Sequence, residues 1–274
     1  MNRTTKVALV TGASSGIGES IAKELTECGF KVYGAARRID RMEHLKTDGI
    51  TPVSLDLTND DSIQFCVGEV IEKEGRIDVL VNNAGYGSYG AIEDVPMEEA
   101  KRQFDVNLFG MARLIQCVTP YMRENHYGKI VNVSSMGGKI WTKFGGWYHA
   151  TKFAVEGFSD CLRMELKSFG IDVVVVEPGG IKTDWGIIAA ENLKKASANG
   201  AYAEAATKAA DGMIKNYSGN MLSKPTLIAK TVRKAVTKRR PRTRYLIGFG
   251  AKPMVWTHKI FGDRMFDWVI KNFS

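Results

Sequence analysis

Short apolar, β-branched runs alternate along this chain with longer stretches whose apolar residues recur at helical spacing. Strands that are apolar on both faces and separated by helices belong to parallel sheets covered on each side. The sequence therefore predicts the α/β class, as one doubly wound parallel sheet with its ligand outside the carboxyl ends of the strands. We expect strands at residues 6–11, 31–36, 51–57, 78–85, 128–135, 171–179 and 244–249, and helices at 16–28, 60–74, 98–122 and 148–170.

The length of 274 residues allows one large α/β domain or two small ones. No proline- or serine-rich linker divides the chain, so we expect a single domain over residues 1–274. An apolar content of 44% is typical of a globular protein. No apolar run reaches the roughly 18 residues that span a bilayer.

The four cysteines, Cys28, Cys66, Cys117 and Cys161, lie far apart and form no C-x-x-C pair. This spacing suits neither a zinc site nor a disulfide framework, so we expect no metal and reduced thiols in the core of a cytoplasmic protein. The N-terminal segment MNRTTKVALVTG enters a strand pattern almost at once, which leaves no room for a secretory signal.

Positive charge is concentrated near the C-terminus. Residues 212–262 contain 12 lysines and arginines and no acidic residue. Such a segment indicates either an anionic partner or membrane surface, or simply a solvated face, and both interpretations stay open. We expect no nucleic-acid binding, because no aromatic-interleaved basic motif accompanies the charge.

A glycine-rich loop, TGASSGIG at residues 11–18, joins the first expected strand to the first expected helix. Gly12, Gly16 and Gly18 allow a tight turn and a close approach to a pyrophosphate, whose charge the helix N-terminal amides stabilise. The same letters contain G-x-S-x-G, the nucleophile elbow of hydrolases, with Ser14 as nucleophile. We reject that alternative because only one strand precedes Ser14, and an oxyanion loop needs earlier strands.

Tyr148 and Lys152 lie four residues apart in an expected helix and therefore share one face. This spacing also occurs on ordinary helix surfaces. If the two side chains meet, the ammonium favours the phenolate and lowers the pKa of the phenol, which suits Tyr148 to general acid–base catalysis.

Seven motifs, in order, resemble those of the short-chain dehydrogenase/reductase family. They are TGASSGIG, DLT (56–58), NNAG (82–85), the asparagine of FDVNLFG, VSS (133–135), YHATK (148–152) and PGGIKT (178–183). The resemblance runs from about residue 5 to residue 183 and implies a Rossmann-type fold and an oxidoreductase that uses a nicotinamide cofactor.

The resemblance also implies catalytic roles. Tyr148 and Lys152 match the catalytic pair, and Ser135 matches the serine that hydrogen-bonds the reacting oxygen. Asn107 matches an asparagine that interrupts a helix and supports a water leading to Lys152, although on sequence alone it could cap a helical turn. His149 has no visible triad partner, and we expect it to be a packing or surface residue.

Cofactor contacts follow from the same match. The residues implied are Gly12, Ser14, Gly16, Ile17, Gly18, Arg37, Asp56, Leu57, Asn83, Ala84, Gly85, Tyr148, Lys152, Gly179, Ile181 and Thr183. In this family an acid at the end of the second strand selects NAD. Here Ala36 stands at that place and Arg37 follows, which favours the 2′-phosphate of NADP, with Ser14 as a possible helper. NAD-linked oxidation remains the alternative, as does a dinucleotide-binding sensor without turnover.

Residues 184–224 occupy the place of the family's substrate lid, and a connection of this length is expected to contain short helices. The candidate pocket walls Met136, Trp141, Phe144, Trp147 and Trp185 favour a lipophilic alcohol or carbonyl substrate. Residues 225–274 form a C-terminal extension of helix, strand and aromatic tail, similar to the hydroxysteroid and retinol dehydrogenase branch. This tail either lies on a membrane or packs over the pocket or a second subunit, and we expect a homo-oligomer.

Overall fold

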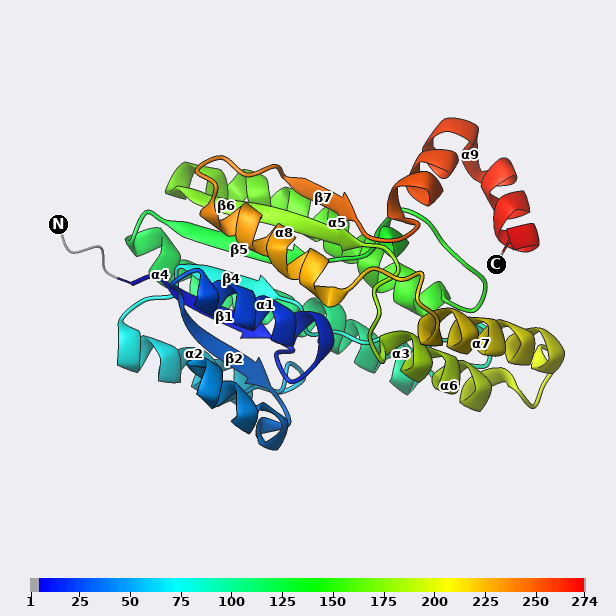
Figure 1. Cartoon of the computed structure of the whole chain (residues 1–274), viewed down its shortest axis with the longest axis horizontal. Helices are drawn as coiled ribbons and strands as arrows, with labels where there is room; N and C mark the ends of the chain where they lie inside the picture. Colours follow the sequence, from blue (N-terminus) through cyan, green and yellow to red (C-terminus); the bar gives the residue numbers. More distant parts are fainter. Residues whose placement is uncertain (1–4, 274) are drawn as a thin grey trace.

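Seven parallel strands run side by side through the centre of the molecule, in the order β3-β2-β1-β4-β5-β6-β7 (Figure 1). The computed structural model describes residues 5–273 of the chain. The order reverses between β1 and β4, which is the point where such sheets bind ligands. The strands are β1 (Val7–Thr11), β2 (Lys31–Ala36), β3 (Ile50–Ser54), β4 (Val79–Asn82), β5 (Gly128–Val133), β6 (Ile171–Pro178) and β7 (Arg244–Ile247).

Helices connect the strands and follow the last one. The α-helices are α1 (Gly16–Glu27), α2 (Asp60–Glu74), α3 (Met97–Phe104), α4 (Gly110–Glu124), α5 (Gly146–Leu166), α6 (Trp185–Ser197), α7 (Ala203–Ser218), α8 (Pro225–Thr237) and α9 (Ala251–Phe273). Three 3₁₀ segments, η1 (Ile39–Asp48), η3 (Met136–Gly138) and η4 (Lys167–Phe169), and one π-helical segment, η2 (Asp105–Phe109), complete the described elements.

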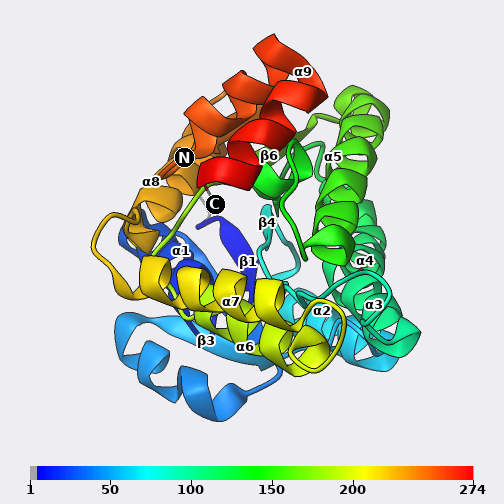
Figure 2. The ribbon, with the colours of Figure 1, turned by 90° about the vertical axis from the view of Figure 1, so that its right-hand side faces the viewer.

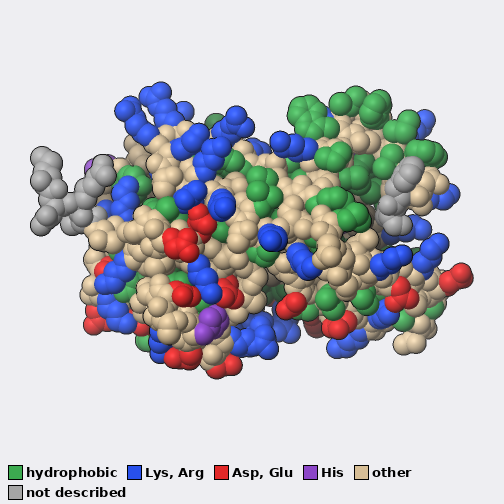
Figure 3. Space-filling model, in the orientation of Figure 1, with side chains coloured by type: hydrophobic (Ala, Val, Ile, Leu, Met, Phe, Trp, Pro, Cys, Tyr) green, Lys and Arg blue, Asp and Glu red, His purple; other side chains and the backbone are tan. Residues whose placement is uncertain are grey.

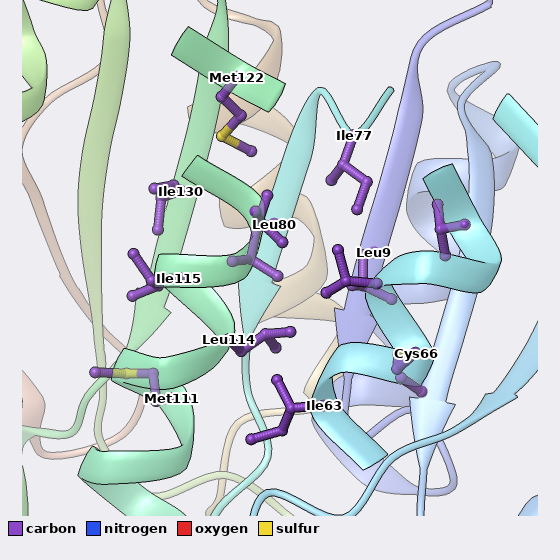
Figure 4. Packing of buried hydrophobic residues seen from close by; sticks show 14 of the residues in the cluster. Leu9, Ile63, Cys66, Ile77, Leu80, Met111, Leu114, Ile115, Met122 and Ile130 are labelled. Atoms are coloured by element: carbon purple, nitrogen blue, oxygen red, sulfur yellow. The ribbon is translucent and has the colours of Figure 1, made fainter. Parts of the chain in front are cut away.

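Both faces of the sheet are covered, so its strands are apolar on both sides. Helices α2, α4 and α5 pack on one face and α1 and α8 on the other. Figure 4 shows the first of these layers, where Leu9, Leu80 and Ile130 of the strands meet α2 and α4. Burying a side chain of this size stabilises the fold by about 1.5–3 kcal/mol.

Local signals fix the ends of α2. The side chain of Asn59 accepts a hydrogen bond from the Ser62 N–H at 2.9 Å, which satisfies an amide that the helix leaves free. At the other end Gly75 adopts a φ of 69°, a left-handed conformation that stops the helix.

The fold class and the single domain predicted from the sequence are confirmed. All seven expected strands are present, several of them shorter than their apolar runs. The expected helix at 98–122 is divided, because η2 interrupts it between α3 and α4. The lid region holds two helices of 13 and 16 residues, α6 and α7, and the aromatic tail is helical.

Seen from the carboxyl ends of the strands, α6 and α7 lie across the end of the sheet (Figure 2). Residues of α6 and of the turns that leave β1, β4, β5 and β6 line the same hollow at this end of the sheet. None of the helices within residues 5–273 combines the length and apolar character that spanning a bilayer requires.

Candidate active site

The β1–α1 loop makes a tight turn at the edge of a cavity. Gly12 and Gly16 have φ values of 69° and 59°, which side-chain-bearing residues rarely adopt. The Gly12 N–H donates to Ala35 O at 2.8 Å, which anchors the loop to β2. Gly12, Ser14, Gly16 and Ile17 line the cavity.

Gly18 lies beneath this loop and does not line the cavity. A Cβ atom on Gly18 would lie 2.1 Å from Gly12 O and 2.6 Å from Asn83 Nδ2, so the loop fits only over a glycine. The amide of Asn83 itself donates to Thr11 O at 3.0 Å. The glycine loop and the turn after β4 are therefore one packed unit.

Arginines gather on the cavity beside the end of β2. Ala36 and Arg37 line the cavity where the sequence placed them. Arg38, which follows Arg37 in the sequence and was weighed with it for the 2′-phosphate, lines the cavity too. Arg41 and Arg102 also line it, and neither was a candidate from the sequence. Arg102 comes from α3, far along the chain, so no local pattern could have indicated it.

Asp56 lies within the field of two of these arginines. Burial acts to raise the pKa of its carboxyl, but hydrogen bonds from the Thr58 N–H and hydroxyl, together with Arg37 and Arg102, outweigh burial and hold that pKa below its ordinary value. Asp56 is therefore ionised and limits the positive charge at this end of the cavity.

At the other end of the cavity Ser135, Tyr148 and Lys152 come together. Ser135 follows β5 and accepts a hydrogen bond from the Gly137 N–H at 3.0 Å. Tyr148 and Lys152 lie on successive turns of α5, and both are buried. The Lys152 ammonium donates to Val133 O at 3.0 Å and lies 5.9 Å from the centroid of the Tyr148 ring.

Burial shifts both titrating groups toward their neutral forms. It raises the pKa of Tyr148, an effect that the Ser135 hydroxyl opposes and Tyr217 reinforces. It lowers the pKa of Lys152 to about 8, against the opposing effect of Glu156. The four-residue spacing predicted that Lys152 lowers the pKa of the Tyr148 phenol. The pKa is raised instead, because desolvation of the buried phenol is the largest effect in the protein alone.

Asn107 lies in η2, where the π-helical turn interrupts the helix. Its side-chain oxygen accepts from the Tyr86 N–H at 3.0 Å, and its amide donates to Tyr86 O at 2.9 Å and to Thr151 Oγ1 at 3.0 Å. A Cβ atom on the intervening Gly85 would lie 2.9 Å from Asn107 Oδ1 and 3.8 Å from Lys152 Nζ. Asn107 is buried and stands behind the cavity wall rather than on it.

His149 is buried beside Tyr148, in line with the packing role expected for it. Its Nδ1 lies 2.9 Å from Gly137 O, and its Nε2 accepts from the Thr142 N–H at 3.0 Å. These two contacts require the neutral ring with its hydrogen on Nδ1. Burial also lowers the pKa of His149, so the residue holds the loop after Ser135 as a neutral group.

One cavity of about 1510 Å³ joins the two ends of the site. With the exception of Gly18 and Asn107, every catalytic or cofactor residue predicted from the sequence lines it, and the members not yet mentioned are Leu57, Ala84, Gly179, Ile181 and Thr183. A nicotinamide dinucleotide fits this arrangement, since Gly12 and Gly16 line the loop end of the cavity without side chains and leave room for its phosphates.

Aromatic side chains form one part of the remaining cavity wall, and charged residues such as Glu98, Glu99 and Lys195 line another. Tyr89, Trp185 and Tyr217 line the aromatic part, and the Trp185 ring lies 5.0 Å from that of Tyr148. Of the candidate pocket walls, Met136 and Trp185 line the cavity, whereas Trp141, Phe144 and Trp147 do not. Trp141 instead packs against α9. Within residues 5–273 no cluster of histidine, cysteine and carboxylate groups could hold a metal ion.

Residues 6–194 match the family model of short chain dehydrogenases. The chain is similar to a probable short-chain type dehydrogenase/reductase, VdlC, of Helicobacter pylori, with 34% identity over 95% of each chain. It is also 41% identical to a 3-ketodihydrosphingosine reductase of Bacteroides thetaiotaomicron over 178 residues, 65% of each chain.

Solved structures that are similar to this chain belong to the same group of oxidoreductases. A short-chain dehydrogenase from Streptomyces avermitilis has a TM-score of 0.82 at 34% identity, covering 98% of this chain and 96% of that chain. A metagenomic short-chain oxidoreductase in complex with NADP has a TM-score of 0.71 at 26% identity, covering 88% and 96%. A 3-ketoacyl-(acyl-carrier-protein) reductase from Brucella melitensis, complexed with NADH, has a TM-score of 0.73 at 27% identity, covering 87% and 94%.

Proposed function

Because the chain belongs to the short-chain dehydrogenase/reductase family, we propose that it interconverts an alcohol and a ketone or aldehyde with NADP as its cofactor. As a member it is an oxidoreductase that acts on a small molecule with a nicotinamide dinucleotide. One observation carries the proposal: the glycine loop, Arg37 and the group of Ser135, Tyr148 and Lys152 line a single cavity.

In the proposed mechanism the residues of α5 and the turn after β5 transfer one proton and stabilise the charge that develops as it moves. Bound NADPH supplies the hydride for reduction. Tyr148 donates its phenolic proton to the oxygen of the carbonyl group and takes a proton back in the reverse reaction. The Ser135 hydroxyl donates a hydrogen bond to that oxygen, where negative charge develops. The Lys152 ammonium favours the phenolate that remains on Tyr148.

The remaining residues hold the cofactor in this proposal. Amides of the loop at Gly12, Gly16 and Ile17 bind the pyrophosphate, above the packing glycine Gly18. Arg37, with Ser14, binds the 2′-phosphate. The adenine and adenosine contacts fall to Asp56, Leu57, Asn83, Ala84 and Gly85, and those of the nicotinamide carboxamide to Gly179, Ile181 and Thr183.

We propose a lipophilic substrate, steroid- or retinoid-like in size. The aromatic wall of Tyr89, Trp185 and Tyr217 supports an apolar ring or chain over a charged metabolite. The relative named as a 3-ketodihydrosphingosine reductase points in the same direction, toward a ketone on an apolar chain. A lid role for residues 184–224 is part of this proposal, since α6 supplies Trp185.

Removal of one oxygen atom tests the mechanism. The Tyr148→Phe variant should lose about 10²–10⁴-fold in kcat, while NADPH still binds, as followed by its fluorescence. Tyr127→Phe, which removes a phenolic oxygen outside the cavity, serves as the matched control. Steroids, retinoids, aldehydes and cyclic ketones form the substrate screen. Undiminished turnover by Tyr148→Phe would refute the mechanism, and NADPH binding without any turnover by the wild-type protein would favour a non-catalytic sensor.

Cofactor choice has a separate test, because NAD-linked oxidation is the second candidate. Ala36 in place of an acid and the arginines at the end of β2 support NADP, whereas relatives occur with either cofactor. Arg37→Asp should lower kcat/KM for NADPH by about 10–100-fold and spare the value for NADH. Arg239→Asp makes the same change of charge at an exposed position outside the cavity. Equal losses with both cofactors would count against a 2′-phosphate contact.

Further partners and location are also proposed. Exposed apolar residues on α5, Phe153 and Met164, support a homo-oligomer, which light scattering on the purified protein tests. The cysteines of the described chain are unpaired, which supports a cytoplasmic location. Cys66 is buried, but Cys28 at the end of α1 and Cys161 on α5 are exposed, so the expectation of core thiols is wrong for these two. Peripheral membrane contact through α9 is a further proposed interaction.

A further inference from the structure

Helix α9 presents large apolar side chains at the molecular surface. Trp256, Ile260 and Phe261 keep 53%, 64% and 62% of their surface exposed. Figure 3 shows hydrophobic side chains gathered where α9 lies in Figure 1, with lysine and arginine side chains at their edge. The α9 patch consists of Trp256, Ile260, Phe261, Met265 and Trp268.

The apolar residues of the patch recur at helical spacing, which is typical of a helix face that is buried against a partner. Gly262, whose φ is 73°, kinks α9 and divides it into two helical segments, each of which carries exposed apolar residues. Trp256 and Ile260 lie one turn apart on the first segment, and Met265 and Trp268 lie one turn apart on the second. One side of the second segment is already packed: Phe266 is fully buried, and its ring lies 5.4 Å from that of Trp141. The helix therefore has one apolar side covered by this chain and another exposed.

Positive charge borders the patch. Lys252, Lys259, Arg264 and Lys271 of α9 are all exposed. Two exposed carboxylates, Asp263 and Asp267, lie on the same helix, so the four cations leave α9 with a net charge of +2. Asp263 lies 2.9 Å from His258 Nε2, and Asp267 accepts from Trp141 Nε1 at 2.9 Å. The surface thus combines exposed tryptophan and phenylalanine with lysine and arginine, the pairing that interfacial helices use at anionic membranes.

We propose that the α9 patch docks onto the surface of an anionic lipid bilayer. Its apolar side chains enter the boundary between headgroups and acyl chains, and the lysines and Arg264 lie among the lipid phosphates. Lys259, whose ammonium lies 5.5 Å from the centroid of the Trp256 ring, marks the depth at which the two environments meet. This proposal rests on the proposed function in one respect: a lipophilic substrate dissolved in the bilayer would then lie close to the cavity of the docked enzyme.

A second copy of the chain is a weaker occupant on electrostatic grounds. A two-fold contact between α9 patches brings together two surfaces of the same net positive charge. Like charges brought together across an interface oppose association. An anionic bilayer instead neutralises all four cations and covers the apolar side chains at the same time.

Vesicle co-sedimentation tests the proposal. The full-length protein is mixed with vesicles of phosphatidylcholine containing phosphatidylglycerol, and with vesicles of phosphatidylcholine alone. The variant Trp256→Ser with Phe261→Ser removes two patch residues, and Lys259→Glu removes one cation. Phe65→Ser is the matched control, because Phe65 on α2 is 65% exposed but lies outside the patch. Light scattering without lipid measures the particle mass of every variant.

We expect the wild-type protein and Phe65→Ser to sediment with the anionic vesicles. The double variant should require at least about tenfold more lipid, and Lys259→Glu about fivefold more. Equal sedimentation of wild type and double variant, or none by the wild type, overturns the proposal. A smaller particle mass for the double variant without lipid also overturns it, in favour of a contact between copies. Tyr148→Phe should still sediment, so failure of the proposed mechanism is distinguishable from failure of docking.

Discussion

At the scale of single residues, burial destabilises the charged forms of Tyr148 and Lys152 on α5. Burial favours the neutral form of each partner, and it lowers the pKa of Lys152 to about 8. Glu156 is the group of α5 that opposes this shift, from one turn further along the same buried face. Its carboxylate is held by Lys139 at 2.9 Å and by Arg244 at 3.1 Å, so its position is fixed.

The Glu156→Gln variant should therefore move the alkaline limb of the pH–rate profile to lower pH. Activity that needs a charged Lys152 falls as pH rises through the pKa of the ammonium, near 8. Loss of the carboxylate, with Lys139 and Arg244 left in place, lowers that pKa further, by about one unit. Initial rates across pH measure the limb. Glu165→Gln, which removes a carboxylate at an exposed position of α5, is the control, and an unmoved limb in Glu156→Gln would show that the carboxylate does not act on Lys152.

The sequence could predict which residues meet in the cavity but not how they titrate there. Ser135, Tyr148 and Lys152 stand next to strand ends or on one helical face, so motif order and local spacing were sufficient. The rise in the pKa of Tyr148 depends on burial among rings such as Tyr89 and Trp185, which come from other parts of the chain. Spacing along one helix carries no information on that burial.

At the scale of elements, the π-helical turn η2 fixes the geometry between three segments. Asn107 in this turn bonds both backbone groups of Tyr86 in the loop after β4 and the hydroxyl of Thr151 in α5. Thr151 in turn donates to Tyr148 O at 2.8 Å. Apolar periodicity alone predicted one helix over 98–122, because an extra residue in a turn barely alters that pattern. The resemblance alone indicated an interruption.

Asn107→Ala should lower stability by about 1–3 kcal/mol, because it removes the partners of the part-buried N–H and C=O groups of Tyr86. Thermal unfolding measures this loss. Asn107→Asp keeps an acceptor for the Tyr86 N–H but sets an oxygen against Tyr86 O, so it should rescue little. Asn125→Ala, at an exposed position just after α4, should change stability by less than about 0.5 kcal/mol. If kcat of the Asn107 variants stays normal well below their melting temperature, the turn serves stability and does not position Tyr148.

At the scale of the whole molecule, a buried charge cluster joins the C-terminal strand to the rest of the sheet. Arg244 of β7 pairs with Glu156 of α5 at 3.1 Å and with Glu177 of β6 at 3.3 Å. Lys139, from the loop after Ser135, lies 3.8 Å from Glu177. Such a cluster draws together segments far apart in the sequence. It could not be predicted from charge patterning, since each member looks like an ordinary surface residue in its own element.

The cluster predicts how stability depends on pH. Burial, and next the nearby Glu156, raise the pKa of Glu177 to about 7, against Lys139 and Arg244. Between about pH 4.5 and 7 the folded state therefore keeps a proton that the unfolded state has released, and stability falls as pH rises through this window.

Glu177→Gln should remove this slope, because an amide does not titrate. The free energy of unfolding of the wild type, relative to the variant, should fall by about 1–3 kcal/mol across the window. Urea denaturation at a series of pH values measures the difference, and the comparison cancels groups common to both proteins, such as His149. Glu165→Gln, at an exposed position of α5, controls for the loss of one carboxylate. A difference that stays constant with pH would mean that Glu177 is already ionised in the folded protein, and Lys139 and Arg244 would then outweigh burial in joining β7 to the sheet.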